Sequence, residues 1–298
     1  MSANPYRIEG PALISFSGGR TSGYMLWHIL DAYDGKLPEN VHVCFANTGK
    51  EREETLRFVY ECGTQWDVPI RWIERRWPGR TADHSLHFEE VGFNSAARRG
   101  EPFAELIRRK QYLPSAGMRY CTTELKVRAM KHFMLSLGYQ HWINAIGLRG
   151  DEMLRVFKQF ALNEQKKQRW TTVMPMATQA GGMVAQRDVQ AFWKEQPFDL
   201  GIHSADGNCD ICFLKHRTSR MRRIRQDPTS ADWWIEQENL AKCSMKDGHG
   251  EHNARFDANE SITQLRDVVL ASPLMDLCTP EDAEFDAECG LWCAGEAA

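Results

Sequence analysis

The sequence lacks a strong charge imbalance and any long apolar run. Its 37 Lys and Arg against 40 Asp and Glu leave a net charge of −3, too small to indicate by itself a nucleic-acid or membrane partner. No apolar segment approaches the ~18 residues of a membrane span, and Met1–Glu9 contain no apolar secretory signal. The 42% hydrophobic residues are enough for a folded core. We therefore expect a cytoplasmic protein with no membrane partner.

The 298 residues fit one large domain or two ordinary ones, and they contain no internal repeat or low-complexity tract. Nine of them are cysteines. An odd count in a reducing compartment argues against a disulfide framework. Two close pairs, Cys209-x2-Cys212 and Cys289-x3-Cys293, favour metal, cluster or redox chemistry instead. Cys44 is expected in the core, and neither Cys62 nor Cys278 is given a role.

The first half of the chain alternates strand-like and helix-like segments. Predicted strands and helices follow in the order Pro11–Phe16 (strand), Thr21–Tyr33 (helix), Val41–Ala46 (strand), Glu51–Gln65 (helix), Ile70–Ile73 (strand), Thr122–Leu137 (helix) and Trp142–Leu148 (strand). Successive strand–loop–helix units predict an α/β fold with a parallel sheet flanked by helices. Pro78–Gly100 shows little periodicity and is predicted to be a long surface connection.

The composition changes near Asn208. Cysteines, a basic stretch, a Trp pair and an acidic tail follow, without a strand pattern. We expect a nucleotide-binding domain over residues 1–205 and an α-helical, cysteine-bearing appendage over residues 206–298. Trp233 and Trp234 are expected in its core rather than as base-stacking platforms.

The strongest motif is Ser17-Gly18-Gly19-Arg20-Thr21-Ser22, between a predicted strand and a predicted helix. Glycines let backbone N–H groups turn toward an anion. Ser17 and Ser22 add hydroxyl donors, and the helix N-terminus favours negative charge. The motif therefore predicts a phosphate-binding loop, with an ordinary strand-to-helix turn as the alternative.

This loop resembles the SGGxxS loop of the PP-loop ATP pyrophosphatases, and the chain is similar to their relatives, the phosphoadenosine phosphosulfate (PAPS) reductase family. Further segments resemble that family in order, over roughly Pro11 to Cys212. They are Phe45–Gly49 with Glu54-Thr55, Arg119–Val127 with its Cys-x4-Lys spacing, Ile146–Glu152 with its Gly-x-Arg-x-x-Glu spacing, and Met174–Met176 followed by Asp188-Val189 and Phe192-Trp193. The resemblance implies an adenine-nucleotide α-hydrolase-like (PP-loop) fold.

The resemblance also implies site residues. Nucleotide-binding residues would be Ser17, Gly18, Gly19, Arg20, Thr21, Ser22, Asn47, Thr48, Gly49 and Gly147, and catalytic residues Arg20, Lys126, Arg149 and Glu152. Arg20-Thr21 stands where the family commonly has Lys-Asp, and Asn47 where it has Asp. Both glycines of the loop are kept, which favours ATP with Mg²⁺ over a sulfonucleotide.

Cys121, Cys209 and Cys212 would hold a [4Fe–4S] cluster in the resembling enzymes, with Cys289 expected as fourth ligand and Cys293 or Cys243 as alternatives. Zinc is the competing metal, Cys243, His249 and His252 could form a separate zinc site, and two buried cysteines after a loop are the structural alternative. The segment Glu288–Trp292 ends in Trp where reductases of this family have His in their Glu-Cys-Gly-Leu-His nucleophile.

Two further features allow opposite interpretations. Lys215–Arg225 carries six Lys or Arg, which would contact nucleic-acid phosphates, stabilise thiolates or form a solvated helix face. His84-x2-His87 is expected at the surface.

Three functions remain open from the sequence. The first is an ATP-dependent adenylating sulfurtransferase that releases pyrophosphate and adds sulfur to a small molecule or to a nucleic acid such as tRNA or DNA, with a sulfur-donor protein and a homodimer as further expected partners. The second is a PAPS or adenosine phosphosulfate reductase releasing sulfite. The third is a nucleotide- or nucleic-acid-binding module without turnover.

Overall fold

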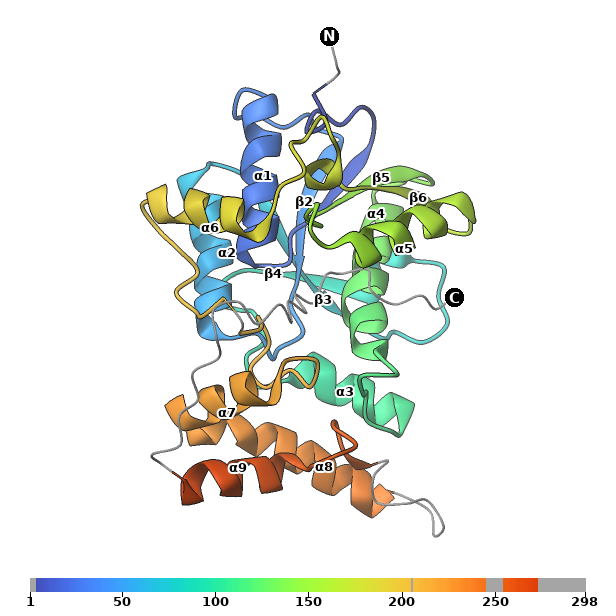
Figure 1. The fold of residues 1–298 in the computed structure, drawn as a ribbon. Helices are drawn as coiled ribbons and strands as arrows, with labels where there is room; N and C mark the ends of the chain where they lie inside the picture. The colour runs from blue at the N-terminus through green and yellow to red at the C-terminus, as the bar shows by residue number, and fades with distance from the viewer. Residues whose placement is uncertain (1–3, 205, 245–253, 273–298) are drawn as a thin grey trace.

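A six-stranded sheet forms the centre of the computed structural model, which describes residues 4–204, 206–244 and 254–272 (Figure 1). Its order is β4-β3-β2-β1-β5-β6, and all neighbouring strands run parallel except β3 and β4. The strands are β1 (Ala12–Ser15), β2 (Val41–Ala46), β3 (Ile70–Arg75), β4 (Phe88–Val91), β5 (Trp142–Ile146) and β6 (Trp170–Val173). The expected α/β fold with a mostly parallel sheet is confirmed, and it is compatible with a Rossmann-like fold.

Both faces of the sheet are buried. Ile14 and Phe45 pack on one face against α1 (Arg20–Ala32), α2 (Glu53–Gln65) and α6 (Gln186–Glu195). Leu13 and Cys44, next to them in sequence, pack on the other face against α4 (Arg128–Ser136). This alternation follows from the two-residue period of a strand. Because both faces are covered, the central strands are almost wholly apolar.

The segment expected to be a surface connection contains regular structure, so that prediction was wrong. It holds a 3₁₀ turn, η1 (His84–His87), and strand β4, which pairs antiparallel with β3 at the sheet edge. The β4 sequence, Phe-Glu-Glu-Val, is short and charged, and its glutamates pair with Arg71 and Arg76. Charged residues are typical of edge strands, and they remove the apolar pattern that would have predicted one.

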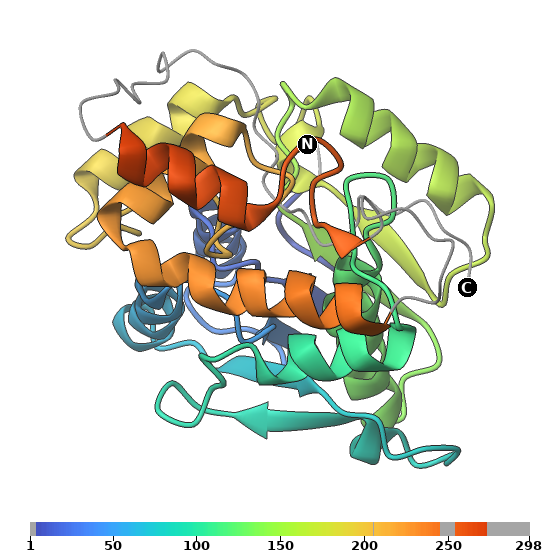
Figure 2. The same ribbon diagram turned by 90° about the horizontal axis from the view of Figure 1, so that it is seen from below.

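The described residues after position 205 form helices, as expected. Helices α7 (Arg217–Gln226), α8 (Asp232–Ser244) and α9 (Ile262–Ala271) surround a second hydrophobic cluster, to which α3 (Glu101–Lys110) and the π-helix η2 (Thr122–Val127) also contribute. Figure 2 shows α8 beside α3, where the Phe103 and Trp233 rings lie 5.3 Å apart. Trp234 is buried at the centre of this cluster, as expected of a core residue. The cluster therefore joins residues on both sides of the predicted boundary at 205/206.

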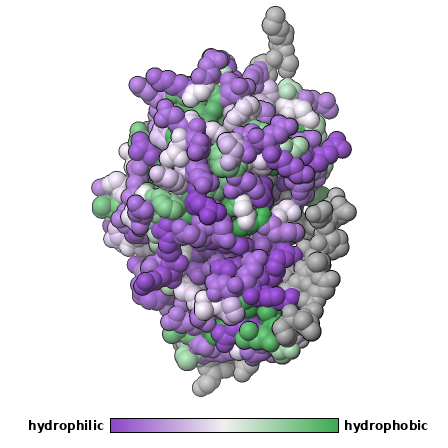
Figure 3. Space-filling model, turned by 90° about the vertical axis from the view of Figure 1, so that its left-hand side faces the viewer, coloured by the Kyte–Doolittle hydropathy of each residue, from purple (hydrophilic) through white to green (hydrophobic). Residues whose placement is uncertain are grey.

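The side of the molecule shown in Figure 3 is mostly hydrophilic, with scattered hydrophobic residues. Among the helices of the described part of the chain, none is both long and apolar enough to cross a membrane.

Three histidines meet where η1 packs on α4. His84 Nδ1 lies 3.1 Å from His132 Nδ1, and the His87 ring stacks on the His132 ring with centroids 4.1 Å apart. His84 and His87 are half-buried rather than fully at the surface. Burial, followed by the charge of Arg75 and the neighbouring histidines, lowers the pKa of His132 to about 3.

We expect this cluster to make the fold sensitive to acid. The unfolded chain binds a proton at His132 near the ordinary pKa of 6.5, whereas the folded chain does not, so stability is lost as pH falls from about 6.5 toward 3. Replacing His132 by Asn should reduce the loss of melting temperature between pH 7.5 and pH 5. The exposed His141→Asn variant is the control; equal pH slopes for both variants and the parent would contradict the assignment.

Candidate functional site

The loops that follow β1 and β5 leave the sheet side by side. The chain runs from β1 outward to β2 and β3 and later returns to β5 on the other side of β1. Ser15 is in register with Ile146, so the two strands end at the same level. A Cβ on Gly147 would lie 3.1 Å from Ser22 Cα, which places the β5 end against the β1 loop. In open α/β sheets such a point of strand-order reversal is where ligands bind.

The loop Ser17–Ser22 has the backbone expected of an anion-binding turn. Gly18 has φ of +78°, and a Cβ there would lie 2.8 Å from Thr55 Cγ2, so only glycine fits. Helix α1 begins directly after Gly19 and has no side-chain cap. The Ser17 and Ser22 hydroxyls lie 2.9 Å apart, and Ser22 Oγ also donates to the Gly19 carbonyl. Here the two serines close the turn.

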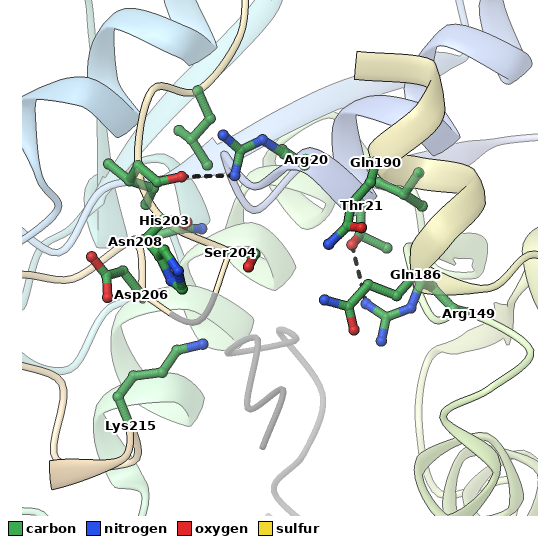
Figure 4. Close-up of a pocket in the computed structure, with 14 residues that line it drawn as sticks. Arg20, Thr21, Arg149, Gln186, Gln190, His203, Ser204, Asp206, Asn208 and Lys215 are labelled. Carbon is green, nitrogen blue, oxygen red and sulfur yellow. Dashed lines mark hydrogen bonds between the residues drawn. The ribbon is translucent and has the colours of Figure 1, made fainter. Parts of the chain in front are cut away.

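A cavity opens beside this loop (Figure 4). Residues of α1, α6, the β5 end and the segments on both sides of the Cys209–Cys212 pair line it: Arg20, Thr21, Arg149, Gln186, Val189, Gln190, Leu200, Ile202, His203, Ser204, Asp206, Gly207, Asn208 and Lys215. Asn208 ties the last of these segments to the loop, because its Nδ2 donates to the Ser17 carbonyl at 2.8 Å. The site therefore combines segments far apart in sequence.

Arg20 lines the cavity, and its guanidinium is already paired with a carboxylate. Its guanidinium donates to both carboxylate oxygens of Asp199, at 2.6 and 2.5 Å, and to the Ile202 carbonyl. Burial raises the pKa of Asp199, but the hydrogen bonds and charge of Arg20 outweigh it and hold that pKa below its ordinary value. Arg20 thus fixes the 199–202 segment against the start of α1.

Arg149 is buried at the β5 end, and Glu152 acts on its backbone. Arg149 Nε donates to Asp151 Oδ1 at 2.8 Å, and its NH1 lies 3.5 Å from Thr21 Oγ1. The Glu152 carboxylate accepts the Arg149 backbone N–H and pairs with Arg155. Glu152, expected to be catalytic, therefore positions Arg149 in this structure.

The loop after β2 was expected to bind nucleotide. Hydrogen bonds of its own side chains fix its conformation. Asn47 Nδ2 donates to Glu74 Oε1 and to the Ala97 carbonyl, and Asn47 Oδ1 accepts from Gly49 N–H. The Thr48 N–H and hydroxyl both donate to Glu51 Oε2. The side chains of Asn47 and Thr48 therefore shape the loop.

Glu51 joins three motifs. Its Oε1 lies 3.2 Å from Lys126 Nζ and 3.7 Å from Cys209 Sγ, and both charged side chains are almost wholly buried. Lys126 thus faces the β2 loop and the cysteine pair. It lies on η2, a π-helix with i→i+5 hydrogen bonds. Residues five apart, such as Cys121 and Lys126, therefore lie closer to the same face than in an α-helix, where they are ~140° apart around the axis.

The three cysteines expected to bind a cluster lie on adjoining segments. Cys121, Ile211 and Phe213 pack in one hydrophobic cluster, and Cys209 reaches the Glu51–Lys126 pair. Within residues 4–204, 206–244 and 254–272, no three His, Cys, Asp or Glu side chains are arranged to hold a metal ion. Outside these ranges lie Cys278, Cys289, Cys293, His249 and His252, so the cluster on Cys121, Cys209 and Cys212, its fourth ligand and the separate zinc site stay predictions.

The two remaining cysteines of the sheet domain are core residues. Cys44 and Cys62 are fully buried, and burial raises the pKa of both thiols.

The basic stretch forms most of α7, and three of its arginines make largely buried ion pairs. Arg220 is buried and donates to Asp257, while Arg222 and Arg223 pair with Asp206 and Asp210. These three arginines therefore do not form a solvated helix face, whereas Arg217 is exposed and pairs with Glu260. Arg222 and Arg223 attach the helical region to the loop of residues 206–212, which carries Cys209 and Cys212 (the cysteine loop).

Sequence reasoning missed Glu51 and Asn208, and it named Lys215 only as the first residue of the basic stretch. Glu51 belongs to the charged run Lys50-Glu51-Arg52 directly after the β2 loop, and Asn208 directly precedes the cysteine pair. Three adjacent charges at the carboxyl edge of a buried strand were the available signal.

No protein-family model matches this chain. A curated protein of Escherichia phage lambda, the uncharacterized nin region protein ORF290, is 29% identical over 243 residues, covering 80% of this chain and 77% of that protein. The similarity extends over most of both chains, but the name of that protein states no activity. The function therefore has to be inferred from the geometry of the site.

Replacing Gly18 by Ala should destabilise the protein more than the same change at Gly35. Both glycines have positive φ, but a Cβ at Gly35 meets nothing within 4 Å. Each variant should lose about 1–2 kcal/mol from the backbone conformation, and Gly18→Ala about 1–3 kcal/mol more from crowding. Urea unfolding of both variants measures the difference; equal losses would mean that the loop is not packed as described.

Replacing Glu51 by Gln should lower the free energy of unfolding by about 3–5 kcal/mol, because it removes the carboxylate that pairs with the buried Lys126 ammonium. The double variant Glu51→Gln, Lys126→Met should lose less than the sum of the single variants. Glu53→Gln, which breaks the exposed pair with Arg98, is the control and should cost under about 1 kcal/mol. Additive single effects would show that the buried pair is not coupled.

Proposed function

We propose that the protein is an ATP-dependent adenylating enzyme of the PP-loop type, similar to the PAPS reductase family, that prepares an acceptor for sulfur transfer. The observation that carries this proposal is the glycine loop Ser17–Ser22, which opens α1 at the point of strand-order reversal beside a cavity. Backbone N–H groups at a helix N-terminus suit phosphate oxygens. Arg149 adds positive charge from the β5 end.

The residues present fit a nucleoside triphosphate. Gly18 gives the turn a positive-φ backbone that packs directly against Thr55, and backbone N–H groups in such glycine turns suit phosphate oxygens. Asp206, a carboxylate lining the cavity, is already bound by Arg52 and Arg222. Mg²⁺ would therefore be held mainly by phosphate oxygens and water, as is usual for this ion.

The proposed reaction is substitution at the α-phosphorus. An acceptor oxygen forms a bond to the α-phosphorus while the bond to the bridging oxygen breaks, and that electron pair leaves with pyrophosphate. Preorganised donors that face the developing charge lower the barrier; Arg149 and the loop N–H groups would have this role. A sulfur nucleophile, from sulfide or a donor protein, would then replace AMP on the acceptor.

A cysteine-bound [4Fe–4S] cluster, or zinc, belongs to the proposal without a step assigned to it. Support comes from Cys121 and the Cys209–Cys212 pair lying on adjoining segments, with Cys209 and Lys126 both in contact with the Glu51 carboxylate. An anaerobic absorption spectrum with iron, sulfide and zinc analysis tests the metal; thiolate-bound iron–sulfur centres absorb broadly near ~400 nm.

Nucleotide turnover can be measured by following AMP and pyrophosphate from ATP with candidate tRNA, DNA and small-molecule acceptors, in the presence of sulfide, which the release of AMP from the acceptor requires. We expect both products to form in equal amounts and Arg149→Lys to reduce their rate by about 10²–10³-fold, as for loss of one transition-state donor. Lys158→Met, an exposed change on α5 (Met153–Glu164), is the control.

Other results would replace this proposal. Sulfite released from a sulfonucleotide, without AMP formation from ATP, would favour the reductase. ATP binding without either product would favour a nucleotide-binding module.

A further inference from the structure

Lys215 is a buried cation that the proposed reaction does not use. Its side chain is about nine-tenths buried, yet it lines the cavity and points into it, across from Arg149 and Gln186 (Figure 4). Its Nζ has no hydrogen-bond partner in the described part of the chain. A buried ammonium without a partner is unfavourable by several kcal/mol, so such a group calls for a ligand.

The neighbouring carboxylates are occupied by other cations. Asp206 accepts from Arg52 on one oxygen and from Arg222 on the other, at 3.1 and 2.7 Å. Asp210 is paired in the same way by Lys50 and Arg223. Lys215 therefore differs from Arg20 and Arg149, which also line the cavity but are matched by Asp199 and Asp151.

We infer that Lys215 binds an oxyanion of the phosphate type in this cavity, opposite the β5 end. A compact ammonium with three donors suits a phosphate group, which it binds as a point charge. Thr21 of the phosphate loop lines the same cavity, and Asn208 fixes the neighbouring segment to Ser17. The same ligand can therefore reach both the loop and Lys215.

The position of Lys215 connects this ligand to the cysteine loop. The Lys215 N–H donates to the Cys212 carbonyl at 2.9 Å, and a Cβ on Gly207 would lie 3.1 Å from Lys215 Cε. The turn that carries the cysteine pair thus also sets the place of the ammonium. Occupation of the anion site should order this turn.

Nucleotide binding at the loop is part of the proposed function, and the test separates it from the role of Lys215. Isothermal titration of the full chain with ATP, pyrophosphate, adenosine phosphosulfate and AMP compares the parent with Lys215→Met and Lys215→Arg. We expect Lys215→Met to bind ATP and pyrophosphate about 10- to 100-fold more weakly, and Lys215→Arg to recover part of the affinity. Lys36→Met, exposed near the amino end of β2, is the control.

Each outcome is decisive. Weakened binding of adenosine phosphosulfate alone would keep the oxyanion site but identify the sulfonucleotide as its source. Pyrophosphate binding that depends on Lys215, with no affinity for ATP, adenosine phosphosulfate or AMP, would keep the site and remove the proposed function. Unchanged affinities in Lys215→Met, or a parent that binds none of these anions, would overturn the inference.

Folding can be checked separately. Because methionine removes a buried charge without a partner, Lys215→Met in anion-free buffer should melt at the same temperature as the parent or higher. Pyrophosphate should raise the melting temperature of the parent and not that of the variant. A variant that melts lower than the parent and is stabilised equally by pyrophosphate would assign Lys215 a structural role instead.

Discussion

The pairing of residues 50–52 with residues 206–210 holds the site together. Lys50 and Arg52 form ion pairs with Asp210 and Asp206, and Glu51 makes an isolated antiparallel bridge with Cys209. The charged groups are largely buried, so much of their mutual attraction offsets the desolvation of each partner. Their main effect is to fix position. A shift of the cysteine loop by one residue would leave several buried charges without partners.

This pairing explains why the helical region is part of the site. The loop that carries Cys209 and Cys212 lies between the carboxyl end of β2 and α7. Two arginines of α7, Arg222 and Arg223, pair with the same aspartates that bind Arg52 and Lys50. Each aspartate is thus shared between the sheet domain and the helical region. The shared hydrophobic cluster of α3, η2 and α8 adds non-directional stabilisation, while the ion pairs set the register between the two parts.

Local patterns predicted the elements whose environment is uniform. Val41–Ala46 is apolar because β2 is buried on both faces, and its bounds follow directly from the sequence. β4 escaped detection because an edge strand with Glu89 and Glu90 has no apolar period. The π-helix η2 escaped for another reason: its wider turn depends on tertiary contacts such as Lys126 with Glu51, which a periodicity does not reveal.

The placement of the candidate site residues could be predicted only where it depends on local sequence or on neighbouring strands. Residues close in sequence, Ser17–Ser22, and the ends of adjacent parallel strands, Gly147 and Arg149, do meet. The roles of individual charges could not be derived, because each depends on a partner far along the chain. Arg20 pairs with Asp199, 179 positions away, and Lys126 pairs with Glu51 just after the carboxyl end of β2.

Charge matching also bears on how the cavity would respond to a ligand. Arg20 and Arg149 already have carboxylate partners, so an arriving anion must share them with Asp199 and Asp151, which reduces the gain from each contact. Lys215 has no such competitor among the described residues. Its ammonium loses hydration on folding and, as far as the described residues go, gains a charged contact only from a ligand. The largest electrostatic change on binding should therefore fall on the turn that carries Cys209 and Cys212, and through Glu51 on Lys126.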